Sequence, residues 1–409
     1  MEPQRIIRLI IMICFALMQE PSAGQTDNRN YTINAPLNTI ERMTIHSRVF
    51  GKDRTILISL PPGYKDNHAR YPVIFFTDGS VSRLNLIKGV AGFLAESNNM
   101  PEAIFVGIVH ARRNWELTPK ANPVQLLDGD TLDPGPDLGG ADTLLAFIRE
   151  ELIPSIDKEY RTISSRIYIG HSHGGLFGFY AMVQQPGLFN AYIDIDPSLW
   201  WNNASLVDSL GCLLKKNPGF QTSLYISFRG AKVQTPKTKL KKLFKNSSDY
   251  QMKFEMLDLL MSETHQSAIL PTIVKGLTEI FKPWQLPKDR FGRIDYANLS
   301  LQQLRQHYAS PILGAVYPLS ESTINSLGYG KLYAGNFHEA IEIFRYNIAL
   351  FPASANTYDS LGEALEKNGL TLDALAAYEK AVATAKVTND ANLEVFQTNR
   401  DRVKKILNQ

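Results

Sequence analysis

The stretch YIGHSHGGLF, residues 168–177, decides the fold. The apolar run that ends at Gly170 predicts a strand buried on both faces, and the residues from Gly174 onward predict a helix. Between them, Ser172 stands in a Gly-X-Ser-X-Gly pattern. Small flanking glycines make a sharp turn sterically accessible, and a serine on such a strand–turn–helix unit is presented to substrate. Ser172 is therefore a candidate nucleophile.

The chain around this stretch alternates short β-rich runs with helical stretches, which is typical of a mostly parallel sheet flanked by helices. We expect one α/β domain over residues 25–284. The expected strands are 55–60, 72–77, 103–109, 166–170, 191–195 and 223–228. The expected helices include 140–152, 174–184 and 268–281.

Composition narrows the classes of partner. With 409 residues and 44% hydrophobic content, the chain can bury a large core. Its net charge of +3 gives no general reason to expect nucleic acid or an anionic membrane as partner. Residues 209–248 contain several lysines and one arginine but no acidic residue, which fits either a solvated basic face or a surface that steers an anionic substrate. We expect no metal and no cofactor, since neither P-loop spacing nor metal-ligand spacing occurs.

The N-terminus has the parts of a secretory signal peptide. Arg5 and Arg8 precede the apolar run 9–18, and small residues follow at 22–24. We expect a signal peptide over residues 1–24 and an exported protein, periplasmic or secreted, in a bacterium, with no membrane span after cleavage. An uncleaved anchor is the alternative. Cleavage would leave Cys212 as the one cysteine, which excludes an intramolecular disulfide.

The C-terminal part repeats itself with an offset of 34 residues. The matching pairs are Leu327 and Leu361, Gly328 and Gly362, Gly335 and Gly369, Ala340 and Ala374, and Phe344 and Tyr378. Period and residue classes are those of tetratricopeptide helix pairs. We expect such repeats over 320–409, ending in a helix at 389–407, with 285–319 as a linker. They either bind a protein or peptide partner or stabilise the first domain.

A serine nucleophile needs a base, and in a hydrolase fold this base is a histidine that follows the last strand. His265 has that position, whereas His171 and His173 adjoin the serine and are expected to line the site or pack. The usual place for the acid, the loop after 223–228, holds no carboxylate. Asp196 is the first alternative and Glu263 the second; a Ser–His dyad, or a backbone carbonyl in place of the acid, also stays open.

The oxyanion of the intermediate needs backbone donors. The N–H of His173, at the start of a helix, is one expected donor. Gly79 or Ser80, in the loop after the strand 72–77, is expected to supply the second.

Five ordered motifs carry a family resemblance: YPVIFFTDG (71–79), VGIVHARRNWELTP (106–119), IGHSHGG (169–175), IDPSLWWNN (195–203) and ETHQSAILPTIVKGL (263–277). Together they resemble the "putative esterase" family of α/β-hydrolases, in particular the branch with enterobactin and bacillibactin esterases. The resemblance implies an esterase that acts on acyl or lactone esters, with Ser172 as nucleophile and His265 as base. Some members of that branch are described as dyads.

Two departures put the substrate in question: Glu116 stands where the family pattern usually has aspartate, and the repeats are absent from siderophore esterases. Trp200 and Trp201 are expected either to face an aromatic acyl group or to form core or subunit contacts. Arg112 or Arg113 is expected to lie near the charge of that group. The rival functions are a feruloyl or acetyl carbohydrate esterase, an acyltransferase, and an inactive hydrolase-fold scaffold.

Overall fold

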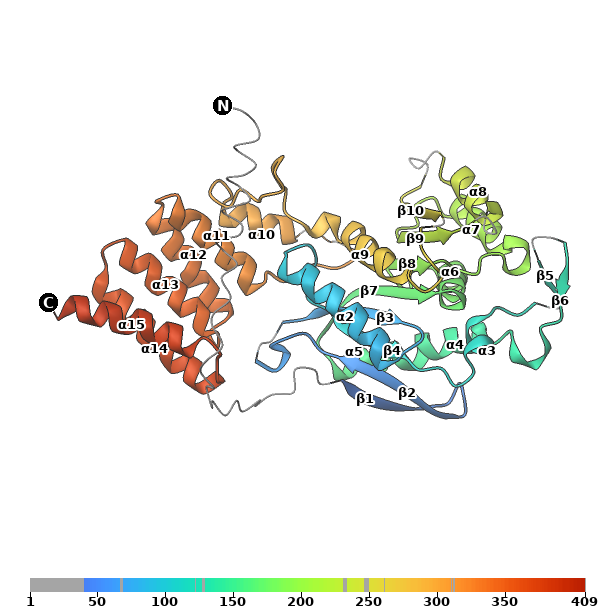
Figure 1. Ribbon diagram of the computed structural model, residues 1–409, viewed down its shortest axis with the longest axis horizontal. Helices are drawn as coiled ribbons and strands as arrows, with labels where there is room; N and C mark the ends of the chain where they lie inside the picture. The colour runs from blue at the N-terminus through green and yellow to red at the C-terminus, as the bar shows by residue number, and fades with distance from the viewer. Residues whose placement is uncertain are drawn as a thin grey trace, which may run out of the picture. The chain divides into compact units, whose positions relative to one another are not determined.

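The computed structural model describes residues 40–66, 69–121, 123–126, 129–230, 234–245, 250–260, 262–309, 311 and 313–408 (Figure 1). The expected signal peptide, residues 1–24, lies outside the described residues. Over the part of the chain that is described, none of the helices has the length and apolar character needed to cross a membrane.

An eight-stranded sheet forms the centre of the α/β domain, in the order β1-β2-β4-β3-β7-β8-β9-β10. Strands β1 and β2, and β2 and β4, pair antiparallel, and every other neighbouring pair is parallel. The bounds are β1 (Glu41–Ser47), β2 (Lys52–Ser59), β3 (Tyr71–Phe76), β4 (Ile104–Ile108), β7 (Thr162–His171), β8 (Ala191–Ile195), β9 (Ser223–Arg229) and β10 (Lys253–Leu260). A two-stranded ribbon, β5 (Val124–Gln125) with β6 (Thr131–Leu132), lies apart from this sheet. The predicted mostly parallel sheet is confirmed.

The strands follow from the sequence because both faces of the sheet are covered. In β3 all side chains are buried, with Val73 and Phe75 on one face and Ile74 and Phe76 on the other. The six expected strands are all present. The two outermost strands were not expected: β1 and β10 alternate exposed and partly buried residues, as edge strands do.

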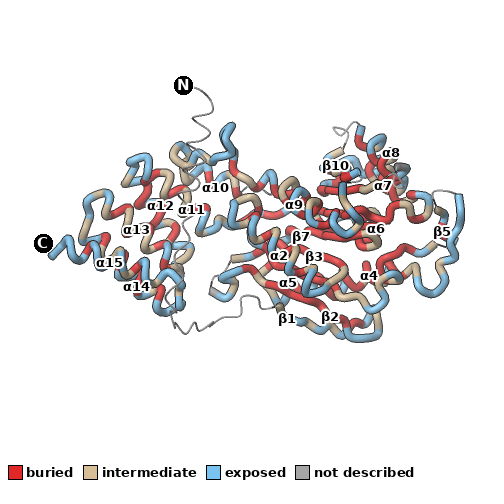
Figure 2. Tube along the Cα trace, viewed as in Figure 1, coloured by how far each residue is buried: buried red, intermediate tan, exposed pale blue. Residues whose placement is uncertain are grey.

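Helices cover the two faces unequally. One face carries α4 (Ala141–Phe147), α5 (Ile153–Glu159), α6 (His173–Gln184), α7 (Ser205–Lys216) and α8 (Gln234–Leu243). The other carries α2 (Val81–Glu96) and α9 (Ile269–Ile280). The helix expected at 140–152 is interrupted by a π-helical turn at Ile148–Leu152 before α5 begins. Figure 2 shows the resulting buried strands between partly exposed helices.

The segment expected as a linker is a packed part of the fold. Residues 285–319 contain α10 (Leu301–Ala309), and Leu304, Tyr308 and Tyr317 belong to the same core as α2 and α9. The Tyr317 hydroxyl donates to Ser165 Oγ, at the sheet, over 2.6 Å. The segment that connects the two regions thus buries apolar side chains of its own.

The C-terminal region is all-helical, as expected, with α11 (Glu321–Tyr333), α12 (Phe337–Leu350), α13 (Ala355–Lys367), α14 (Thr371–Thr388) and α15 (Leu393–Leu407). A Cβ on Gly328 would lie 2.4 Å from the Phe344 ring, and one on Gly362 would lie 2.7 Å from the Tyr378 ring. The same glycine–aromatic contact thus recurs in both helix pairs. The interpretation as tetratricopeptide repeats stays a prediction.

Candidate active site

The turn that carries Ser172 is strained and tightly packed. Ser172 follows β7, precedes α6, and has φ 59° and ψ −116°, a combination that L-residues rarely adopt. A Cβ on Gly170 would lie 2.2 Å from the carbonyl oxygen of Gly174, so the turn closes only with glycine at position 170. The Ser172 carbonyl accepts hydrogen bonds from the N–H groups of Leu176 and Ser198. The backbone is thereby fixed in the conformation that presents the hydroxyl.

A pocket of about 240 Å³ opens at this turn. Its lining combines the candidate nucleophile and base with three charged side chains: Asp78, Arg83, Arg113, His171, Ser172, His265 and Gln266. Ser172 and His265 are 93 positions apart in the sequence, and the fold brings both to one pocket. Asp78, Arg83 and Gln266 also line this pocket, and no pattern in the sequence indicated that they would.

Asp196 and His265 form the second half of the arrangement. His265 Nδ1 lies 2.7 Å from Asp196 Oδ2, and the Asp196 side chain is 7% exposed. Since a carboxylate only accepts, Nδ1 carries the proton and Nε2 keeps its lone pair. Of the acids considered from sequence, the structure brings Asp196 to His265; no hydrogen bond joins Glu263 to this histidine among the described residues.

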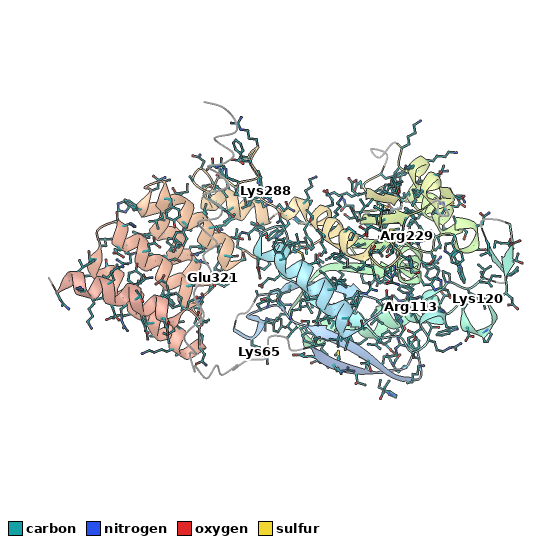
Figure 3. The ribbon with its side chains drawn as sticks, in the orientation of Figure 1. Lys65, Arg113, Lys120, Arg229, Lys288 and Glu321 are labelled. Carbon is teal, nitrogen blue, oxygen red and sulfur yellow. The ribbon has the colours of Figure 1, made fainter. Side chains whose placement is uncertain are left out.

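The loop after β9, where the acid was first sought, contributes to the same cluster in another way. Arg229, labelled in Figure 3, stands where β9 ends and this loop begins. Its backbone N–H donates to Asp196 Oδ1 over 3.0 Å, and its Nε lies 3.4 Å from Oδ2. The Asp196 N–H in turn donates to the Ser227 carbonyl over 3.1 Å. These bonds orient the carboxylate from β9, although it comes from the end of β8.

His171 holds the loop that carries His265. Its Nε2 donates to the His265 carbonyl over 2.8 Å, and the two rings lie 4.3 Å apart. Burial, and next the neighbouring His265, lower the pKa of His171 to about 4. His171 is consequently neutral at physiological pH and places no charge beside His265. His171 lines the pocket, one of the two roles expected for it.

The expected oxyanion donors are the backbone N–H of His173 and that of Gly79 or Ser80. His173 is the first residue of α6, where backbone N–H groups lack partners within the helix. The Gly79 N–H, however, donates to the Ile108 carbonyl over 2.9 Å, so Gly79 is a wrong choice of donor. A Cβ there would lie 2.7 Å from the Ile108 backbone, which explains the glycine by packing. Ser80 caps α2 through its hydroxyl, and its backbone N–H, the alternative second donor, stays a prediction.

The two candidate arginines separate clearly. Arg113 lines the pocket and donates two hydrogen bonds to Asp78. Its Nε lies 2.5 Å from Oδ1, and its Nη2 lies 2.9 Å from Oδ2. Burial alone would raise the pKa of Asp78, but the Arg113 bonds outweigh it and hold that pKa below its ordinary value. Arg112 points away from the pocket, to Asp137 and the Trp115 ring. Of the two arginines expected near the charge of a substrate, Arg113 is thus the one that lines the pocket.

Glu116, noted as a departure from the family pattern, anchors the segment that carries Arg113. Its carboxylate is buried and binds Arg54 through two bonds of 2.8 and 2.7 Å and His110 Nδ1 at 2.7 Å. Burial would raise the pKa of Glu116, yet the bonds from Arg54 and His110 hold it well below its ordinary value. A charged carboxylate is thus kept in the core, and the α3 helix (Arg113–Leu117) is fixed to the sheet.

One of the two tryptophans, Trp201, packs in the core. Trp201 is 2% exposed and belongs to the core under α6 and α7, so it does not face a substrate. Trp200 is partly buried against the same core, with its ring 6.4 Å from that of His173. Neither tryptophan lines the Ser172 pocket.

Burial, followed by the charge of Arg113, lowers the pKa of His173 to about 4.

The fold and this site define an α/β-hydrolase. Residues 47–248 match the family model described as "Putative esterase", so the α/β domain is similar to that family. It is 37% identical over 100 residues to the siderophore enterobactin esterase of Emericella nidulans, a match that covers 24% of this chain and 33% of the relative.

Two longer matches add coverage. The chain is 24% identical over 275 residues to the siderophore triacetylfusarinine C esterase of Aspergillus fumigatus, covering 57% of this chain and 90% of the relative. An IroE-like serine hydrolase from Shewanella oneidensis has a similar fold, with a TM-score of 0.62 and 23% identity over 77% of this chain and 99% of that one. The chain thus spans a third of the Emericella relative but nearly all of the other two.

Proposed function

We propose that the protein is a serine esterase, with Ser172 as nucleophile, His265 as general base and Asp196 as the acid that orients it. The Asp196–His265 hydrogen bond at the pocket that Ser172 lines carries this proposal. It supports a triad over a dyad. It also removes the main argument for an inactive scaffold, which was the missing carboxylate.

The reaction would proceed in two halves. His265 Nε2 takes the proton of the Ser172 hydroxyl as the oxygen attacks the ester carbonyl, and Asp196 stabilises the imidazolium. The His173 N–H, at the positive end of α6, stabilises the oxyanion. The imidazolium then protonates the leaving alcohol, and an acyl-enzyme remains. Water, deprotonated by His265, attacks this ester and releases the acid and the free Ser172 hydroxyl.

The substrate class is proposed from the relatives and the pocket together. Two relatives are named for ester hydrolysis of siderophores, and the pocket here is rich in charge. A siderophore-type ester or lactone is the first candidate substrate. We propose that the protein that hydrolyses it is exported. Feruloyl or acetyl sugars, and transfer of the acyl group to a sugar hydroxyl, are the competing outcomes of the same acyl-enzyme. A protein or peptide partner for the C-terminal helices stays a prediction.

Hydrolysis of 4-nitrophenyl butyrate by the full chain tests the reaction class. Ser172→Ala and His265→Ala should each lower kcat by at least about 10³-fold while leaving thermal unfolding near that of the wild type. Full activity in folded Ser172→Ala would refute the proposal. Catechol trilactones, feruloyl sugars and acetyl sugars, compared by kcat/KM, then separate the substrate classes.

A further inference from the structure

The charges that line the Ser172 pocket do not cancel. Arg113 is matched by Asp78 through the two bonds described above. His171 is neutral at physiological pH, because its pKa is lowered to about 4 by burial and next by His265. Asp196 lies behind His265, where Arg229 also contacts it. The remaining charged side chain of the lining is Arg83.

Arg83 has no carboxylate of its own. Among the described residues no acidic side chain forms a salt bridge with its guanidinium, and its printed hydrogen bond is the backbone N–H to Ser80 Oγ over 3.1 Å. Burial is the largest influence on Arg83, and it lowers the pKa of the guanidinium. The attraction of Asp78, which Arg113 already binds, acts in the opposite direction but is smaller than the effect of burial. The charge is thus partly desolvated without a carboxylate bonded to it, which is an unfavourable state for a cation.

The position of Arg83 in the helix adds to this cost. It is the third residue of α2, whose first turn contains no acidic side chain. The N-terminus of a helix carries partial positive charge, so a cation there is disfavoured, and Arg113 lies close enough to repel it as well. An anion in the pocket would relieve both effects, since the helix end and Arg83 would then attract the same group.

We propose that Arg83 is a specificity-determining residue that binds an anionic group of the ester, so that the enzyme prefers negatively charged esters over neutral ones of the same shape. This inference rests on the proposed function. The pocket of about 240 Å³ is about eight times the ~30 Å³ that one water molecule occupies in the liquid, which is room for a small acyl group with a carboxylate.

Matched pairs of esters test the proposal on the full chain. 4-Nitrophenyl hemisuccinate carries an anion on the acyl side, and 4-nitrophenyl methyl succinate is its neutral counterpart. 4-Acetoxybenzoate and its methyl ester place the same difference on the alcohol side. Arg83→Gln should lower kcat/KM for the anionic member of at least one pair by about tenfold or more and for the neutral member by less than about twofold. Arg83→Lys, which keeps the charge, should recover part of the loss.

Arg112→Gln is the matched control, because it removes the same charge one residue from Arg113 but outside the pocket. It should leave the preference unchanged. Equal effects of Arg83→Gln on the charged and neutral members of both pairs would overturn the proposal, and so would an equal effect of Arg112→Gln.

Binding separates this inference from the proposed function. Calorimetry of 4-nitrophenyl hemisuccinate with Ser172→Ala needs no turnover, and Arg83→Gln in that background should weaken Kd by about tenfold. If the wild type hydrolyses no ester, the proposed function fails, yet an Arg83-dependent Kd would still support the anion site. An unchanged Kd, together with unchanged preference in turnover, would refute the anion site while ester hydrolysis stands.

Discussion

Replacing Asp196 by asparagine should change the proton on His265 without changing the shape of the site. Oδ1 of Asp196 accepts the Arg229 N–H, and the asparagine oxygen can keep that bond. The amide nitrogen then takes the place of Oδ2, 2.7 Å from His265 Nδ1, and donates to it. The proton of the imidazole moves to Nε2, which no longer accepts the serine proton.

The size of the effect follows from the lost charge. A carboxylate about 4 Å from the centre of the imidazolium stabilises it by about 4 kcal/mol at an effective dielectric constant near 20. Asp196 is 7% exposed and His265 is 39% exposed, so water screens the pair in part, as the effective dielectric constant near 20 allows for. At about 1.4 kcal/mol per factor of ten, we expect kcat to fall by about 10³-fold.

The assay is kcat for 4-nitrophenyl butyrate between pH 6 and 9, with thermal unfolding as the test of folding. Glu263→Gln is the matched control: it removes the same charge two positions from His265, where no hydrogen bond to this histidine is present among the described residues. A fall of less than tenfold in Asp196→Asn, or an equal fall in Glu263→Gln, would refute the reasoning.

Three further predictions concern positioning and stability. His171→Ala should lower kcat about tenfold, because it removes one hydrogen bond to the loop that carries His265. His171→Gln keeps a donor and should recover part of the lost kcat. Equal kcat values in the two variants would contradict this. Both carboxylate oxygens of Asp194 are buried without partners, and burial raises its pKa well above the ordinary value. The contribution of Asp194 to stability is therefore fully present below about pH 4, the ordinary pKa, and is lost as pH rises through the folded pKa. Asp194→Asn should accordingly gain Tm over the wild type at pH 8 more than at pH 4; a constant gap would count against it. Gly328→Ala should lower the free energy of unfolding by about 1–3 kcal/mol through overpacking against the Phe344 ring of α12. Gly92→Ala, in open space on α2, should leave the free energy of unfolding unchanged or raise it by up to about 1 kcal/mol. Similar shifts of the denaturant midpoint in the two variants would refute the packing account.

Local patterns were enough for the centre of the fold. The strand before Ser172 is apolar on both faces and the glycines around it permit one sharp turn, so pattern and structure agree there. The repeat period likewise led to the correct glycine–aromatic pairs in the C-terminal helices. The edge strand β1 was missed because ERMTIHS, with charged and apolar residues interleaved, reads equally well as surface loop.

The site was harder to predict from the sequence than the fold, because its residues meet only through tertiary structure. Arg112 and Arg113 are neighbours of identical chemistry, and only the direction in which α3 starts sends one to Asp78 and the other to Asp137. Arg83, in the first turn of a helix, looks like an ordinary solvated residue until α2 is placed beside Ser172. The unusual signal in the sequence was a cation in a first turn without acidic residues.

Covalent labelling by a fluorophosphonate probe tests the central claim most directly, because the probe reacts with an activated serine whatever the natural ester is. The full-length wild type should be labelled at Ser172, Ser172→Ala should not be labelled, and labelling of His265→Ala should be at least about 10³-fold slower. Labelling that persists in folded Ser172→Ala, or a folded wild type that does not react, would contradict the account.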